Sequence, residues 1–123
     1  MSGDRILIRD LHLRGIVGLN DWERRARQDI LIGLELHVDL RAAGRSDDVD
    51  DTLNYRTLTK RIIRHVEQAS PRLVETLATE IARIAVVEMG AKRVKVRVEK
   101  PGALRFAASV GVEIERSAAD FDA

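Results

Sequence analysis

Alternation of apolar and polar residues constrains this chain more than any other feature. The clearest run extends from Ile30 to Leu40, where every second residue is apolar. Positions 94–98 and 110–114 repeat the pattern on either side of a turn-rich segment. Apolar side chains at every second position predict strands with one buried face and one polar face. The chain must therefore build a sheet whose apolar face is covered.

A further strand is expected near the N-terminus, between Asp4 and Ile16. Its alternation shifts by one residue near Asp10, which is the pattern of a strand with a β-bulge. Residues 19–27, which follow, are polar and turn-rich and are expected to form an irregular connection. Because this connection is short, we expect the first two strands to be antiparallel neighbours.

Two helices are expected between the two strand pairs. Asn54 is the best N-cap candidate, and apolar residues spaced by four predict a first helix from Tyr55 to about Gln68. A second helix is expected to continue to about residue 88. Ser70 is its expected cap and Pro71 its first helical residue, because serine caps helices and proline is tolerated at the first position.

The expected order is strand, strand, helix, helix, strand, strand. A surface loop is expected at residues 41–51 and a polar tail at residues 117–123. The pattern predicts an α+β fold in one domain, residues 1–123, with a four-stranded antiparallel sheet and both helices on one face. The opposite face is charged but balanced in sign. It is either a solvated surface or the wall of a tunnel formed by several sheets joined edge to edge.

Composition excludes several classes of function. The chain has no cysteine, which excludes disulfides and thiolate zinc sites, and its three histidines fall in different elements, so we expect no metal. A net charge of +1 and an aromatic content of 3% argue against nucleic-acid binding. The apolar runs are too short for a membrane span or a signal peptide, so we expect no membrane contact and a cytoplasmic location.

Lys100 lies where a predicted strand stops. Pro101 has no N–H to donate to a strand ladder, and Gly102 permits backbone angles that other residues avoid, so the chain is expected to turn just after this lysine. An amine fixed at the end of a sheet is well placed for chemistry. The alternative is an ordinary solvated lysine in a turn.

Four short motifs occur in the order and spacing of one enzyme family. They are Gly18 with Glu23 and Gln28, then residues 51–55, residues 73–75 and residues 99–101. Together they resemble the dihydroneopterin aldolase family of folate biosynthesis, over about residues 6–116. The resemblance implies the tunnelling fold (T-fold). It also implies assembly as a homo-tetrameric ring, commonly stacked into a homo-octamer, with active sites between subunits.

The resemblance implies a specific carbon–carbon lyase reaction. The family cleaves 7,8-dihydroneopterin between C1′ and C2′ of its side chain, giving 6-hydroxymethyl-7,8-dihydropterin and glycolaldehyde. The N5=C6 imine of the ring accepts the electrons left at C1′. A Schiff base, a metal and a cofactor are then unnecessary, and proton transfer is the remaining task.

The resemblance assigns two catalytic residues. Lys100 would act as general base and acid on the 2′-hydroxyl through a bound water. Tyr55 would come from a neighbouring subunit and pass protons to and from the reacting side chain. On the residues alone, Tyr55 could equally pack at the start of its helix.

Four residues would bind the substrate by the same resemblance. Glu75 would accept the N2 and N3 hydrogens of the pterin with both carboxylate oxygens, and Glu23 would contact the substrate's tail. Val74 and Leu53 would complete the site. Without the family, Glu75 is a solvated helix carboxylate and Glu23 is half of a weak surface ion pair.

The chain also departs from the aldolase pattern. Val17 and Arg27 occupy places where many aldolases carry histidine and glycine. Residues 53–57 and 103–106 look closer to the sister group, dihydroneopterin triphosphate 2′-epimerase, which would use the same site. Four arginines could meet a triphosphate, namely Arg24, Arg25, Arg56 and Arg105, but ordinary solvated arginines explain the same residues equally well. A further alternative is a non-catalytic pterin-binding or scaffold domain of the same fold.

Overall fold

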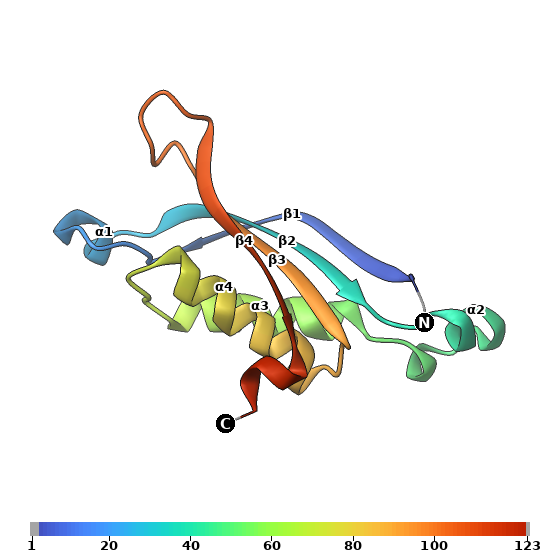
Figure 1. The fold of residues 1–123 in the computed structure, drawn as a ribbon. Coiled ribbons are helices and arrows are strands. Elements are labelled where there is room, and N and C mark those ends of the chain that lie inside the picture. Colours follow the sequence, from blue (N-terminus) through green and yellow to red (C-terminus); the bar gives the residue numbers. More distant parts are fainter. Residues whose placement is uncertain (1–2, 123) are drawn as a thin grey trace.

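The computed structural model describes residues 3–122, so the ends of the predicted domain and the last residue of the predicted tail lie outside the described residues. Four strands form one sheet, namely β1 (Arg5–Gly15), β2 (Gln28–His37), β3 (Arg93–Pro101) and β4 (Ser109–Ser117). They lie in the order β1-β2-β3-β4, and every neighbouring pair is antiparallel. The predicted four-stranded antiparallel sheet is therefore confirmed (Figure 1).

The first strand pair contains a β-bulge and ends earlier than its alternation suggests. The register of β1 and β2 shifts between Ile8 and Leu11, and Asp10 has φ of 52°, so the predicted bulge is confirmed. β2 ends at His37, although the alternation continues to Leu40. Just past this end, the Asp4 carbonyl oxygen still accepts the Val38 N–H at 3.4 Å, whereas the Leu40 N–H is accepted by the Asp4 side chain at 3.1 Å instead of by a strand backbone.

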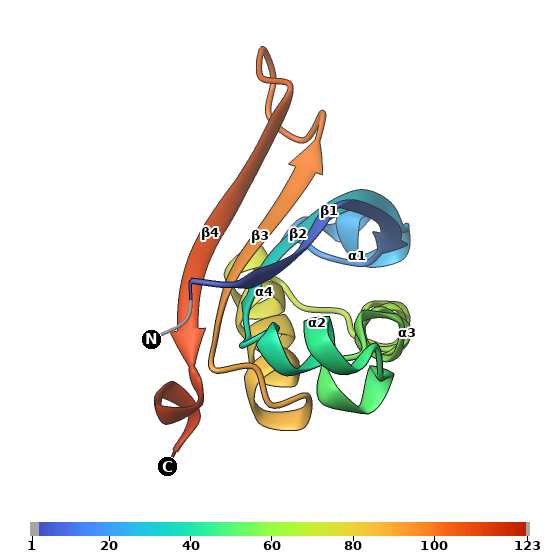
Figure 2. The ribbon, with the colours of Figure 1, turned by 90° about the vertical axis from the view of Figure 1, so that its right-hand side faces the viewer.

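Two long helices cover one face of the sheet, as predicted (Figure 2). α3 (Tyr55–Gln68) begins at Asn54, whose side chain accepts the N–H groups of Arg56 and Thr57 at 3.0 and 3.3 Å. α4 (Val74–Arg83) continues into the π-turn η2 (Ile84–Glu88). The core between sheet and helices is aliphatic, with Ile30, Ile32, Leu36, Val94, Val96 and Val98 from the strands and Leu58, Ile62, Leu77 and Ile81 from the helices.

The predicted start of the second helix is wrong. α4 begins at Val74, after Leu73, and no side chain caps it. Ser70 and Pro71 lie in an irregular segment before the helix, where their carbonyl oxygens accept hydrogen bonds from Arg24 and Gly18. Ser70 and Pro71 therefore make hydrogen bonds to a distant part of the chain instead of capping and starting the helix.

Segments expected to be irregular contain short helices. α1 (Asp21–Arg25) lies in the connection between β1 and β2. α2 (Arg41–Ser46) and the 3-10 helix η1 (Val49–Asp51) replace the expected surface loop, and the 3-10 helix η3 (Ala118–Phe121) lies in the expected tail. Helices this short cannot display an apolar stripe, so periodicity does not reveal them. α1 and α2 lie at opposite ends of the sheet in Figure 1.

Candidate active site

Lys100 is buried, which contradicts its reading as a solvated turn lysine. The inward residues of β3 are Val94, Val96 and Val98, and Lys100 continues this alternation. Its side chain is 11% exposed. The burial of Lys100 can be predicted from the sequence, because side chains two positions apart in a strand point to the same face. Strand β3 thus places an amine at the end of the apolar face of the sheet.

Glu23 is the ionic partner of Lys100. Its Oε2 lies 2.6 Å from Lys100 Nζ, and the two side chains are 8% and 11% exposed. The hydrogen bond from Lys100 lowers the pKa of Glu23 to about 2, although burial works in the opposite direction. Glu23 is therefore ionised in the folded protein at neutral pH. Its reading as half of a weak surface pair is wrong, whereas its contact with a substrate stays a prediction.

A set of neutral donors fixes the carboxylate of Glu23. The backbone N–H and side-chain amide of Asn20 donate to Oε1 at 3.2 and 2.9 Å, and Gln28 Nε2 donates to Oε2 at 3.3 Å. Neither Asn20 nor Gln28 was predicted as a site residue, although Gln28 belongs to one of the four motifs. An asparagine three residues before a glutamate is the sequence pattern of a helix-capping box, and it could have revealed both α1 and the Asn20 contact.

Gly18 makes room for this carboxylate. It is buried with φ of 145°, and a Cβ added there would lie 2.2 Å from the carboxyl carbon of Glu23. Any larger residue would displace Glu23 and would also be strained in the backbone. Gly18 therefore permits the close approach on which the Lys100–Glu23 pair depends.

Val17 contributes its backbone to the site. Its carbonyl oxygen accepts from Lys100 Nζ at 3.3 Å and from Gln28 Nε2 at 2.9 Å. Its side chain is fully buried in the core. The departure from the family pattern at this position therefore leaves the hydrogen bonds to Lys100 and Gln28 intact.

Glu75 lies at the same end of the molecule as Glu23. It is exposed and occupies the first turn of α4, where a carboxylate interacts favourably with the positive end of the helix. The segment just before α4 is joined to the segment before α1 by a hydrogen bond from Gly18 N–H to Pro71 O, 3.2 Å long. Val74, the first residue of the helix, is partly buried against the core.

Tyr55 lies far from Lys100 within one chain. It starts α3 and is 57% exposed, while Val66, near the other end of α3, adjoins Gly15 at the end of β1. Eleven residues of helix separate Tyr55 from Val66, which corresponds to about 16 Å. Leu53, just before Tyr55, is buried in the core. A single chain therefore brings Lys100 and Glu23 together but leaves Tyr55 at the opposite end of the molecule.

The four arginines considered for a triphosphate differ in their surroundings. Arg24 donates to backbone carbonyl oxygens of its own chain, so it is already engaged. Arg105 lies over the ring of Phe106, with 5.4 Å from its Cζ to the ring centre. Arg25 and Arg56 are exposed.

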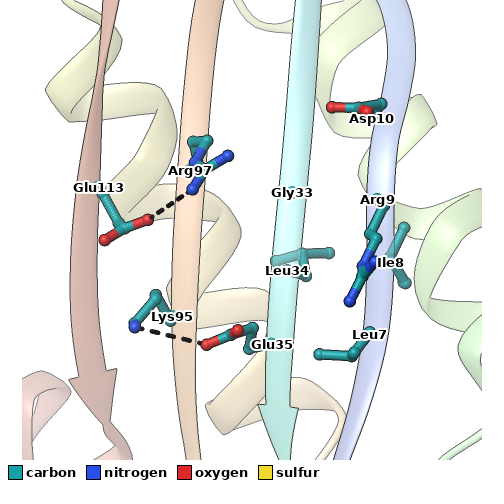
Figure 3. Close-up of a pocket in the computed structure, with 10 residues that line it drawn as sticks. All are labelled: Leu7, Ile8, Arg9, Asp10, Gly33, Leu34, Glu35, Lys95, Arg97 and Glu113. Carbon is teal, nitrogen blue, oxygen red and sulfur yellow. Dashed lines mark hydrogen bonds and ion pairs between the residues drawn. The ribbon is translucent and has the colours of Figure 1, made fainter.

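A hollow of about 480 Å³ lies on the other face of the sheet, over Gly33 (Figure 3). Its charged lining is balanced, with Arg9, Lys95 and Arg97 against Asp10, Glu35 and Glu113. Lys95 pairs with Glu35 (3.5 Å) and Arg97 with Glu113 (3.3 Å). The expected balance of charge on this face is confirmed. Neither Lys100 nor Glu23 lines the hollow, and its neutral balance gives no attraction for an anion.

Two kinds of feature are absent from the part of the chain that the structure describes. No three side chains of histidine, aspartate or glutamate converge as metal ligands among residues 3–122. Within the same residues, no helix has the length and apolar character needed to cross a bilayer.

Sequence comparison connects this arrangement to known proteins. The family model of FolB, dihydroneopterin aldolase, matches residues 6–115. The chain is 37% identical to the dihydroneopterin aldolase of Escherichia coli over 113 residues, which cover 92% of this chain and 93% of that protein. It is 39% identical to the dihydroneopterin triphosphate 2′-epimerase of Pseudomonas aeruginosa over 110 residues, or 89% of each.

A third relative is much longer. The chain is 41% identical to the folic acid synthesis protein FOL1 of Dictyostelium discoideum over 114 residues. These residues cover 93% of this chain but only 17% of that protein.

Solved structures agree in fold. The E. coli dihydroneopterin aldolase, solved in complex with neopterin, superposes with a TM-score of 0.89 at 37% identity, covering 93% of this chain and 99% of that one. A FolB protein of Vibrio cholerae superposes with a TM-score of 0.92 at 38% identity, covering 95% and 99%. The predicted T-fold architecture is confirmed.

Proposed function

Because this chain belongs to the dihydroneopterin aldolase family, we propose that it cleaves 7,8-dihydroneopterin in folate biosynthesis. The products are 6-hydroxymethyl-7,8-dihydropterin and glycolaldehyde. The observation that carries this proposal is the buried ion pair of Lys100 and Glu23, held at the end of the sheet beside the start of α4. An amine and a carboxylate shielded from water can perform acid–base chemistry at a defined position.

The proposed reaction needs only proton transfers. Lys100 removes the proton of the 2′-hydroxyl through a water, the C1′–C2′ bond breaks, and its electrons pass into the N5=C6 imine. Glycolaldehyde leaves, and a proton returned to C1′ completes the pterin product. Glu23 would accept hydrogen bonds from the substrate's tail.

The pterin ring is proposed to bind at the start of α4. Glu75 is exposed there and free to accept two N–H groups with its two carboxylate oxygens. Val74 of the same chain is proposed to contact the ring as well. Leu53, which lies beside Tyr55, would do so from the neighbouring subunit. Leu53 is buried in its own core, so its contribution would come through its backbone. The bound neopterin of the E. coli enzyme supports a pterin as the ligand.

A neighbouring subunit is proposed to complete the site. Tyr55 is exposed at the end of the molecule opposite to Lys100, so it can reach a lysine only in another copy. β1 and β4 each pair on one side only, which leaves two sheet edges for contacts between copies. We propose a homo-tetramer or homo-octamer with its sites between subunits. A cytoplasmic location stays a prediction from the sequence.

The second candidate function is 2′-epimerisation of dihydroneopterin triphosphate. It is favoured by the P. aeruginosa epimerase, which is as similar to this chain as the E. coli aldolase is. In this reaction the aldehyde would add back to C1′ through its other face. Because Arg24 is already engaged, a triphosphate would depend on the exposed Arg25, Arg56 and Arg105.

Product analysis separates these functions. The purified enzyme is incubated with dihydroneopterin and, separately, with its triphosphate, and products are resolved by chromatography. We expect glycolaldehyde and the hydroxymethyl product from dihydroneopterin. Accumulation of the C2′ epimer without glycolaldehyde would replace the aldolase with the epimerase. Pterin binding without turnover of either compound would identify a non-catalytic domain.

A further inference from the structure

Arg24 joins two segments that lie far apart in the sequence. Its Nη1 donates to Gly18 O at 3.2 Å and to Pro71 O at 3.0 Å, and its Nη2 donates to Ser70 O at 2.7 Å. The side chain is half-buried. All three acceptors are backbone carbonyl oxygens, so the guanidinium fixes the course of the chain rather than a side chain.

The first joined segment carries Glu23 and contacts Lys100 of β3. Arg24 follows Glu23 directly in α1, and Gly18 is the residue that makes room for the Glu23 carboxylate. Lys100 is bonded to both Glu23 and the carbonyl oxygen of Val17, next to Gly18. Movement of this segment would therefore displace Glu23 and both acceptors of the Lys100 amine.

The second joined segment leads into the pterin-binding end of α4. Ser70 and Pro71 lie three to four residues before the helix, which starts at Val74 without a side-chain cap. The position of the first turn, and of Glu75 in it, depends on what holds this segment in place. The hydrogen bonds to Pro71 O and Ser70 O supply that restraint.

We propose that Arg24 is a positioning residue that sets the spacing between the Lys100–Glu23 pair and the pterin-binding Glu75. This inference rests on the proposed function of these three residues. A substrate held by Glu75 reacts only when its 2′-hydroxyl is aligned with Lys100, and misplacement by about 1 Å can reduce the rate by about 10²-fold. A planar guanidinium can bond several carbonyl oxygens in a fixed geometry, whereas an ammonium lacks that geometry.

The test compares Arg24→Ala, Arg24→Lys and the control Arg72→Ala. Arg72 lies in the same segment as Ser70 and Pro71 but is exposed, and it makes no hydrogen bond or ion pair recorded within residues 3–122. Each variant is assayed for kcat with dihydroneopterin, and for the affinity and number of binding sites with neopterin.

For Arg24→Ala we expect kcat to fall by about 30- to 100-fold. The number of neopterin sites should stay the same and their Kd should change by less than about threefold, because Glu75 remains. Arg24→Lys should lose about tenfold in kcat, and Arg72→Ala should match the wild type. Guanidinium ions added at tens of millimolar should restore part of the activity of Arg24→Ala, and ammonium ions should not.

Three results would overturn the proposal. They are a kcat of Arg24→Ala within twofold of the wild type, an equal loss in Arg72→Ala, and a loss of neopterin sites in proportion to activity. If Arg24→Ala does not fold, Arg24→Lys decides, and wild-type kcat in that variant rejects the role. An inactive wild-type enzyme would instead reject the proposed function itself.

Discussion

At the scale of single residues, Lys100 and Glu23 show what the sequence reveals and what it hides. The motifs pointed to both residues, but not to their contact, because 77 positions separate them along the chain. The contact depends on α1, a single helical turn that periodicity cannot detect. Burial of Lys100 could have been read from its alternation with Val96 and Val98, which places all three on one face of β3.

Lys100→Ala tests the proposed base. Removal of the amine should lower kcat by about 10²- to 10⁴-fold, the usual range for loss of general acid–base catalysis. Binding of neopterin should persist, because Glu75 is unchanged. Steady-state kinetics and a neopterin titration measure the two effects. Activity close to that of the wild type would remove Lys100 from the mechanism.

Glu23→Gln tests the energetics of the ion pair. At neutral pH this change should lower the free energy of unfolding by about 2 to 3 kcal/mol, because it leaves a buried ammonium without its charged partner. Denaturant unfolding followed by circular dichroism measures the difference between wild type and variant.

The difference in the free energy of unfolding between wild type and Glu23→Gln should become smaller as the pH falls. The pKa of Glu23 is lowered in the folded protein from 4.5 to about 2, so its ionised form stabilises the fold. That stabilisation is fully present above the unfolded pKa and is lost as the pH falls through the folded pKa. The gap between wild type and Glu23→Gln should narrow between about pH 4.5 and about pH 2. A gap that stays constant over this interval would show that the carboxylate charge contributes nothing.

At the scale of elements, the sequence predicted what its periodicity could express. The four strands and the two long helices are periodic, and each was predicted with the correct type and order. α1, α2, η1 and η3 were not predicted, because helices of three to six residues cannot show a buried stripe. The start of α4 was misplaced, because the roles of Ser70 and Pro71 are set by Arg24, which lies 46 or 47 residues earlier in the chain.

The hairpin of β3 and β4 supports Lys100 and offers a test at this scale. Gly111 pairs with Glu99, next to Lys100, and a Cβ added to Gly111 would lie 2.1 Å from Val98 O. Gly111→Ala should therefore push the strands apart and destabilise the protein by about 2 kcal/mol.

Gly44→Ala provides the matched control for the hairpin. Gly44 lies in α2, and an added Cβ there meets no atom within 4 Å. Alanine in a helix should stabilise by about 0.5 to 1 kcal/mol. Thermal unfolding of both variants measures the contrast. Equal midpoints for the two would contradict the close approach of β3 and β4.

At the scale of the whole molecule, one chain supplies only part of the proposed site. The fold could be predicted because its core follows periodic patterns within the chain. Contacts between copies follow no such pattern, so the partner of Tyr55 came from the family resemblance alone. Several large apolar side chains are exposed, among them Leu19, Trp22, Leu104 and Phe106. Their exposure fits a chain that forms further contacts with copies of itself.

A mixed assembly tests the shared site most directly. Lys100→Ala and Tyr55→Phe chains, each carrying a different affinity tag, are co-expressed, and assemblies containing both are purified. Each variant alone should be nearly inactive. In the mixture, half of the sites have an intact Lys100, and half of those meet an intact Tyr55 from the neighbouring chain. About a quarter of wild-type activity should therefore return in a closed ring of identical interfaces. Mixed assemblies that remain as inactive as the separate variants would contradict an active site built from Lys100 of one subunit and Tyr55 of the next.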